Sequence, residues 1–186
     1  MNAAHMAFCP SEDWRQMLEE LVFPPALDGV DLGNDVLEIG PGPGFVTDTL
    51  RTRTARVTTV EIDPVLYEPL VERMAGTNVD VRLGDATDLD LPDDRFSAAI
   101  SFNMLHHVPT VELQDQIFSE LARVTRPGGL LVAVDGTHSE DSQAFHEGDT
   151  YNPIETAAVA SRLEAAGFTD VAVRDFDLGW IATAHA

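Results

Sequence analysis

Three glycines separated by prolines follow an apolar run near the start of the chain. Segment 36–50 reads VLEIGPGPGFVTDTL, so Gly40, Gly42 and Gly44 stand between a β-strand pattern and a helical pattern. Glycine has no Cβ atom and therefore lets the backbone approach a bound group closely. Such a turn before a helix predicts a site for a small polar ligand. The third glycine comes four positions after the first, which differs from the dinucleotide-binding spacing.

Acidic residues follow the next two strand patterns. Segment 57–63 reads VTTVEID and places Glu61 21 positions after the first glycine. In a βαβ unit the tip of the second strand lies beside the glycine turn, so a carboxylate there can accept hydrogen bonds from both ribose hydroxyls of an adenosine. Segment 79–86, VDVRLGDA, ends in Gly84 and Asp85. Three strand tips therefore each offer an acid or a glycine turn.

Alternating helix and strand patterns predict a parallel sheet covered by helices. Strands are expected near 35–39, 57–62, 79–83, 97–102, 170–176 and 179–185, with another from a turn at 127–129 to Asp135. Helices are expected near 12–22, 44–53, 64–75, 110–124 and 155–166. Ser11 is the expected N-cap of the first helix, and Pro24 with Pro25 is expected to stop it.

In these motifs the chain resembles the class I S-adenosylmethionine-dependent methyltransferases, in particular the small single-domain, type 11-like group that acts on small molecules or lipids. The resemblance covers residues 35–135 and rests on VLEIGPGPG, VEIDP, GDATDLDLPDDRFSAAIS and LARVTRPGGLLVAVD, in that order. It implies an α/β fold with a doubly wound, Rossmann-like sheet of seven mostly parallel strands. An antiparallel C-terminal strand closes this sheet in the family, and helices cover both faces.

The resemblance also implies a site for the cofactor S-adenosyl-L-methionine. Glu38 is expected to hold the ammonium group of the methionine moiety, and Asp85 to accept from the adenine amino group. A loop-capping role is the alternative for Asp85. The expected cofactor-binding residues are Glu38, Gly40, Pro41, Gly42, Gly44, Glu61, Ile62, Asp85, Ala86, Ser101, Phe102 and Asn103.

Methyl transfer is an in-line displacement that requires alignment and, for some acceptors, a base. His106 and His107 are the candidate bases, because imidazole titrates near neutrality and their loop is expected at the carboxyl end of the sheet. Adjacent residues at a helix start are not expected to face one site together. The candidate substrate contacts are His138, His146, Tyr151 and Trp14. A plain exposed loop, for the first three, and a core position, for Trp14, are the alternatives.

Length and composition predict one domain, because 186 residues with 44% hydrophobic content suffice for one core. We expect a single methyltransferase domain over 1–186. Its expected parts are an N-terminal helical lid over 1–30, a cofactor-binding core over 35–135, a substrate loop over 136–154, and a last helix with the closing hairpin over 155–186.

The formal net charge is −21, and all 11 basic residues are arginines. Such a field repels nucleic acids and anionic lipid surfaces, so neither is an expected partner. Cys9 is the sole cysteine and fits a reducing compartment. The first residues lack a secretory pattern, which favours the cytoplasm. A monomer or homodimer is expected.

Missing motifs narrow the predicted chemistry. The segment SFNM after the fourth strand replaces the motif of amine-directed nucleic-acid enzymes, and Asn103 there offers no carboxylate for the metal of the catechol type. The sequence therefore predicts metal-independent methyl transfer to an O, N or C atom of a small molecule. One alternative is a protein that binds S-adenosylmethionine or S-adenosylhomocysteine without catalysis. Another is a nicotinamide-dependent oxidoreductase, which the glycine spacing and the absence of lysine disfavour.

Overall fold

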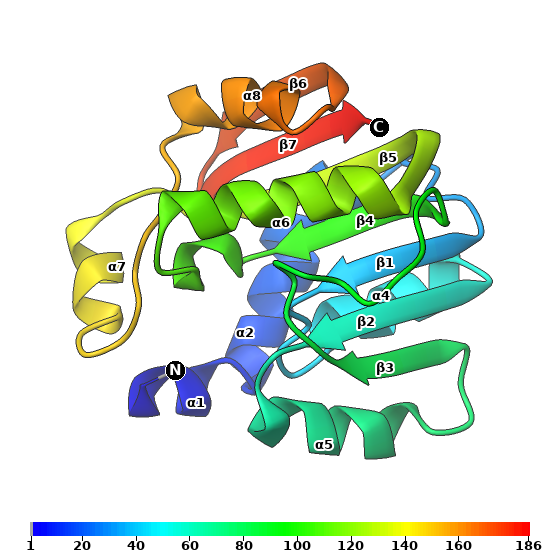
Figure 1. The fold of residues 1–186 in the computed structure, drawn as a ribbon. Helices are drawn as coiled ribbons and strands as arrows, with labels where there is room; N and C mark the ends of the chain where they lie inside the picture. Colours follow the sequence, from blue (N-terminus) through cyan, green and yellow to red (C-terminus); the bar gives the residue numbers. More distant parts are fainter. Residues whose placement is uncertain (1) are drawn as a thin grey trace.

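A seven-stranded sheet organises the computed structural model, which describes residues 2–186 (Figure 1). The strands are β1 (Asp35–Ile39), β2 (Arg56–Glu61), β3 (Val79–Leu83), β4 (Phe96–Phe102), β5 (Thr125–Asp135), β6 (Thr169–Phe176) and β7 (Gly179–His185). Their order across the sheet is β3-β2-β1-β4-β5-β7-β6, and β7 alone runs antiparallel to the other strands. The predicted fold class is confirmed. Residue 1, which opens the expected lid, lies outside the described residues.

Helices lie on both faces of the sheet. They are α1 (Ala3–Phe8), α2 (Glu12–Met17), a π-helical turn η1 (Leu18–Val22), α3 (Phe23–Leu27), α4 (Phe45–Arg53), α5 (Pro64–Met74), a 3₁₀ turn η2 (Leu105–His107), α6 (Val111–Val124), α7 (Glu140–Phe145) and α8 (Thr156–Ala165). Four of the five expected helices agree with α4, α5, α6 and α8 to within about one residue at each end. Within residues 2–186, no helix has the length and apolarity needed to cross a bilayer.

Two apolar layers, one on each face, hold the sheet in place. All five residues of β1 are buried, and its side chains alternate between the layers. Leu37 packs in the layer formed with α6 and α8, whereas Val36 packs in the layer formed with η1, α3 and α4. Strands buried on both faces read as continuous apolar runs, which explains the pattern found in the sequence.

The N-terminal helix departs from the expectation. Ser11 does cap α2, since its Oγ accepts from the Trp14 N–H at 3.2 Å. Pro24 and Pro25 do not stop the helical path, because the chain passes through η1 and continues as α3 with both prolines in its first turn. Proline is tolerated there, since the first N–H groups of a helix need no intrahelical partner.

Two further features differ from the sequence-based expectation. The turn expected at 127–129 lies within β5, which begins at Thr125 and shifts register against β4 between Phe96 and Ala98. Helix α7 lies in the link expected as a loop, and α1 precedes the expected first helix. Figure 1 shows α1 and α7 at the end of the sheet where strands β1 to β5 finish.

The burial of β1 yields a stability prediction. Leu37 is fully buried, whereas Leu83 in the edge strand β3 is 52% exposed. We expect Leu37→Ala to lower the free energy of unfolding by about 2–5 kcal/mol, because it leaves a cavity between the sheet and its helices. The matched variant Leu83→Ala is expected to lower the free energy of unfolding much less. Urea denaturation measures both, and equal losses would contradict the assigned core.

Candidate functional site

A cavity of about 520 Å³ opens at the carboxyl ends of the parallel strands. Its walls include residues 40–43 after β1, residues 61–63 at the end of β2, residues 84–87 after β3 and residues 102–104 at the end of β4. The order of the strands reverses between β1 and β4, so the connections that follow them run to opposite faces of the sheet. Open α/β sheets bind ligands at such a reversal.

The glycine turn after β1 forms one wall. Gly40 and Gly42 have φ values of +61° and +54°, a region that side chains with a Cβ atom rarely adopt. A Cβ at Gly40 would lie 2.8 Å from the Cβ of Met104, whereas one at Gly42 would meet no atom within 4 Å. Gly42 therefore presents bare backbone to open space. Gly44 does not line the cavity; it precedes α4, and a Cβ there would lie 2.5 Å from Leu70 Cδ1.

Glu61 joins the tip of β2 to this turn. Its Oε2 accepts from the Gly42 N–H at 3.1 Å, and its Oε1 accepts from the Asp63 N–H at 2.9 Å. Burial raises the pKa of Glu61 above its usual value. The carboxylate lines the cavity as expected, and it also orients the glycine turn.

The wall after β2 and β3 contains the residues expected near adenine. Ile62 lines the cavity with 65% of its surface exposed, which offers a flat ring an apolar contact. Ala86 and Asp85 also line it. Asp85 Oδ1 accepts from both the N–H and the hydroxyl of Thr87 at 2.8 Å, so the loop-capping role is present in the structure.

The end of β4 places only part of its expected set in the cavity. Phe102 and Asn103 line it, whereas Ser101 is fully buried in the strand and does not. Asn103 adopts φ +52° and donates its backbone N–H to Val134 O at 2.8 Å. Its Nδ2 atom is buried without a hydrogen-bond partner among the described residues. A ligand acceptor would satisfy such a donor.

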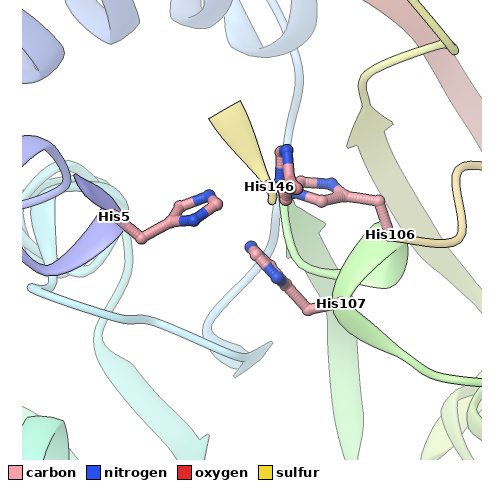
Figure 2. A group of neighbouring side chains, drawn as sticks. All are labelled: His5, His106, His107 and His146. Carbon is pink, nitrogen blue, oxygen red and sulfur yellow. The ribbon is translucent and has the colours of Figure 1, made fainter. Parts of the chain in front are cut away.

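The two candidate bases have different environments (Figure 2). His106 does not line the cavity; its Nδ1 pairs with Asp135, which raises the pKa of His106 although burial opposes this shift. His107 lines the cavity, and burial, together with His106 and His5, lowers its pKa to about 3. His107 is therefore neutral at pH 7 and a weak base. The two rings lie 4.2 Å apart in one cluster, but only His107 faces the cavity, as expected for adjacent residues.

Only one of the four expected substrate contacts reaches the cavity. Trp14 lines it, with its ring 5.6 Å from that of Phe8. His138 and His146 line a separate shallow hollow. Tyr151 stacks on His146 with ring centroids 4.2 Å apart and donates its hydroxyl to Thr137 O at 3.3 Å.

The expected lid over 1–30 and the expected substrate loop over 136–154 each also contribute to the cavity wall. Cys9, near the end of α1, and Asp149, in the link after α7, both line it. Asn2 ties these segments together: its backbone N–H donates to Asp149 Oδ2 at 2.9 Å, and its Nδ2 donates to Phe145 O at 2.9 Å. Nothing in the local sequence predicts that two short segments, about 140 positions apart, would pair.

Glu38 is the most deeply buried acid in the cavity wall. It is 2% exposed, and Thr47 donates its hydroxyl to Oε2 at 2.6 Å. Burial, opposed by the Thr47 hydrogen bond and reinforced by the charge of Glu61, raises the pKa of Glu38 to about 7. A buried acid gains most from a cationic ligand, which would restore its ionised form.

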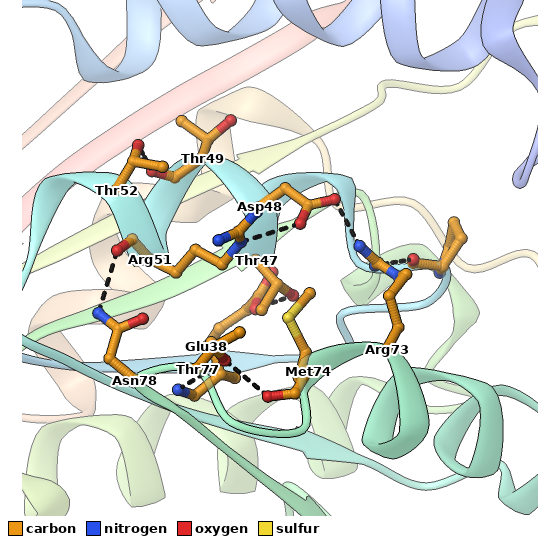
Figure 3. Close-up of polar contacts among 12 residues, drawn as sticks. Glu38, Thr47, Asp48, Thr49, Arg51, Thr52, Arg73, Met74, Thr77 and Asn78 are labelled. Carbon is orange, nitrogen blue, oxygen red and sulfur yellow. Dashed lines mark hydrogen bonds and ion pairs between the residues drawn. The ribbon is translucent and has the colours of Figure 1, made fainter.

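An arginine missed by the sequence analysis supports the same wall. Arg73 of α5 donates to Pro43 O and pairs with Asp48 of α4, both at 2.6 Å (Figure 3). This side chain fixes the position of the glycine turn relative to the two helices. The i+25 separation between Asp48 and Arg73 leaves no periodic signal in the sequence.

Known proteins resemble this chain in sequence and in fold. A family model described as "Methyltransferase domain" matches residues 37–133. "Probable S-adenosylmethionine-dependent methyltransferase" of Mycolicibacterium smegmatis is 32% identical over 143 residues, which cover 73% of this chain and 52% of that protein. "Probable ribosomal RNA small subunit methyltransferase A" of Methanothermobacter thermautotrophicus is 34% identical over 102 residues, covering 49% and 37%. The chain thus spans about half or less of these two relatives.

One solved structure illustrates the likeness of the fold. The PH0226 protein of Pyrococcus horikoshii superimposes with a TM-score of 0.84 at 18% identity, over 100% of this chain and 99% of that one. At this identity the match concerns the fold alone.

The raised pKa of Glu38 predicts a pH-dependent stability. The folded protein holds the Glu38 proton more tightly than the unfolded chain, so its contribution to stability falls as pH rises from about 4.5 to about 7 and stays low above that. Glu38→Gln removes this titration and retains an oxygen for Thr47. We expect its stability relative to the native protein to increase by about 3 kcal/mol between pH 4 and pH 8.

Denaturation at a series of pH values measures this difference. The exposed Glu68 provides the control, because Glu68→Gln changes a carboxyl group that is already in water. Parallel pH profiles for Glu38→Gln and the native protein would contradict the assigned burial effect.

Proposed function

Because this chain belongs to the class I S-adenosylmethionine-dependent methyltransferase family, we propose that it transfers a methyl group from S-adenosyl-L-methionine to an O, N or C atom of a small molecule. The cofactor supplies a methyl group already activated on a positive sulfur. The proposal rests on one observation. A glycine turn with open space above it and two buried acids line the same cavity at the carboxyl ends of the strands.

The residues of the cavity fit this cofactor. Glu38 is buried and receives the ammonium group, which offsets the cost of ionising the carboxyl. The open space over Gly42 admits the ribose and the carboxypropyl chain, and Glu61 accepts from the ribose hydroxyls. Ile62 contacts adenine, and Asp85 accepts from its amino group through the carboxylate that also caps the loop.

The chain contributes alignment and exclusion of water to the transfer. Phe102 and Asn103 position the groups near the methyl carbon, and Trp14 adds an aromatic surface to the cavity wall. A displacement on an activated carbon is accelerated mainly by such positioning. His107 lines the cavity as a neutral imidazole, whereas His106 does not line it and makes no contact with the acceptor.

Charge favours a neutral or cationic acceptor. The described residues that line the cavity include five acids and no arginine; the acids are Glu38, Glu61, Asp63, Asp85 and Asp149. Eight of the 11 arginines form ion pairs with carboxylates, namely Arg15, Arg51, Arg56, Arg73, Arg82, Arg95, Arg123 and Arg162. With a net charge of −21, these features favour a small molecule over nucleic acid, although several relatives are named for ribosomal RNA.

The site of action proposed here is the cytoplasm. Cys9 is a free thiol in the cavity wall, where an oxidising environment would expose the ligand site to modification.

A substitution in the glycine turn tests the cofactor site. We expect Gly42→Val to abolish binding of S-adenosylmethionine and S-adenosylhomocysteine in calorimetric titrations, because the side chain fills the space over the turn. Gly76→Val is the matched control: Gly76 also has a positive φ, +77°, and open space, but lies outside the cavity wall. Both variants are expected to lose about 1–2 kcal/mol of stability, and only the first to lose binding. Unchanged binding by Gly42→Val would refute the site.

An acceptor screen tests the proposed reaction. Pools of neutral, cationic and anionic small molecules, and ribosomal RNA, are incubated with the protein and cofactor labelled in the methyl group. We expect label in the neutral or cationic pool, because the cavity wall is acidic. Label in RNA alone would contradict the proposal of a small-molecule acceptor and identify RNA as the acceptor. Micromolar cofactor binding without label in any pool would favour the non-catalytic binding protein.

A further inference from the structure

Four of the six histidines of the chain meet at one point beside the cavity (Figure 2). His5 comes from α1, His106 and His107 come from η2 after β4, and His146 caps the end of α7. One nitrogen of each side chain lies within 4.8 Å of one nitrogen of every other. Three of the four residues are buried, and His107 is half-buried.

The spacing of the rings matches that of a tetrahedral metal centre. Zn²⁺ with Zn–N bonds of about 2.0 Å places the ligand nitrogens about 3.3 Å apart and the ring centroids about 5 Å apart. Five ring separations in the cluster range from 4.2 to 5.3 Å. Small rotations of the side chains therefore suffice to bring the four nitrogens to bonding distance.

Hydrogen bonds fix the tautomers of two of these residues. His146 Nδ1 donates to Ser142 O at 2.6 Å, and its buried Nε2 has no hydrogen-bond partner among the described residues. His106 Nδ1 pairs with Asp135, which leaves the lone pair on Nε2. A ring held at one nitrogen by a carbonyl or a carboxylate, with the other nitrogen facing a shared centre, is the usual arrangement of a metal-binding histidine.

Two carboxylates lie next to the cluster and offset the charge of a cation. Asp135 is fully buried against His106, and Asp149 Oδ2 lies 3.3 Å from His5 Nδ1. Because Asp135 contacts a histidine, it can orient a ligand without binding the ion itself.

We propose that His5, His106, His107 and His146 bind one divalent transition-metal ion, with Zn²⁺ as the best fit to four imidazole nitrogens. This site goes beyond the proposed methyl transfer and does not rest on it. The ion joins α1 and α7 to the loop after β4, and so holds the N-terminal segment and the link against the cavity that Cys9 and Asp149 line.

Titration of the protein, prepared without a polyhistidine tag and freed of metal by a chelator, tests this site in the absence of S-adenosylmethionine. We expect Co²⁺ to bind with 1:1 stoichiometry and to give the intense visible absorption of a tetrahedral centre, and Zn²⁺ to displace it. Zn²⁺ is also expected to raise the melting temperature, because it binds the folded state.

Single variants identify the ligands. His5→Ala, His107→Ala and His146→Ala are each expected to weaken Zn²⁺ binding by at least about tenfold, since even loss of an outer partner of a ligand costs that much. His185→Ala removes an exposed histidine at the end of β7 and is expected to leave affinity unchanged. Circular dichroism of the metal-free variants checks their fold. His146→Gln replaces His146→Ala if the alanine variant fails to fold.

Two results would overturn the proposal. One is the absence of a 1:1 complex with either ion. The other is equal affinity in His146→Ala and His185→Ala, which would mean that the ion binds to surface imidazoles only. Because the titration contains no cofactor and no acceptor, neither result bears on the proposed methyl transfer.

Discussion

The geometry of the site depends on one hydrogen-bonded link between two strand tips. β1 lies between β2 and β4, fully buried, and the chain must leave it through a turn with left-handed residues. Glu61 at the tip of β2 accepts from the N–H of Gly42 and so fixes that turn. The same carboxylate faces the cavity. A change at Glu61 therefore alters both the shape of the binding wall and its charge, and the two effects are not separable by removing the side chain.

The parts of the molecule that could be predicted from the sequence are those set by local pattern. The strands of the core, the helices between them and the turn at Gly42 follow from hydrophobic periodicity and from the conformations that glycine alone adopts readily. Glu61 and Asp85 were found at strand tips because parallel strands end at one edge of the sheet. The direction in which a strand side chain points was harder to predict. Ser101 lies one residue before Phe102 in β4 and does not reach the cavity.

Contacts between segments that lie far apart in the chain could not be predicted from the sequence. Helices α1 and α7 are six residues each, too short to show a period, and they exist in part because each packs on the other through Asn2 and Phe145. The histidine cluster depends on this pairing, since His5 and His146 come from these two segments. The path through Pro24 depends on the π-helical turn before it, which releases the chain from the ordinary helical spacing.

The bond between Asn2 and Asp149 has a kinetic consequence. This hydrogen bond holds α1 against the link after α7. Both segments line the cavity at that point, so each contributes to its rim. Where a ligand passes between these segments, the residence time of the bound molecule follows the lifetime of their contact as well as its own affinity. In such an arrangement, turnover is limited by release when the chemical step is fast.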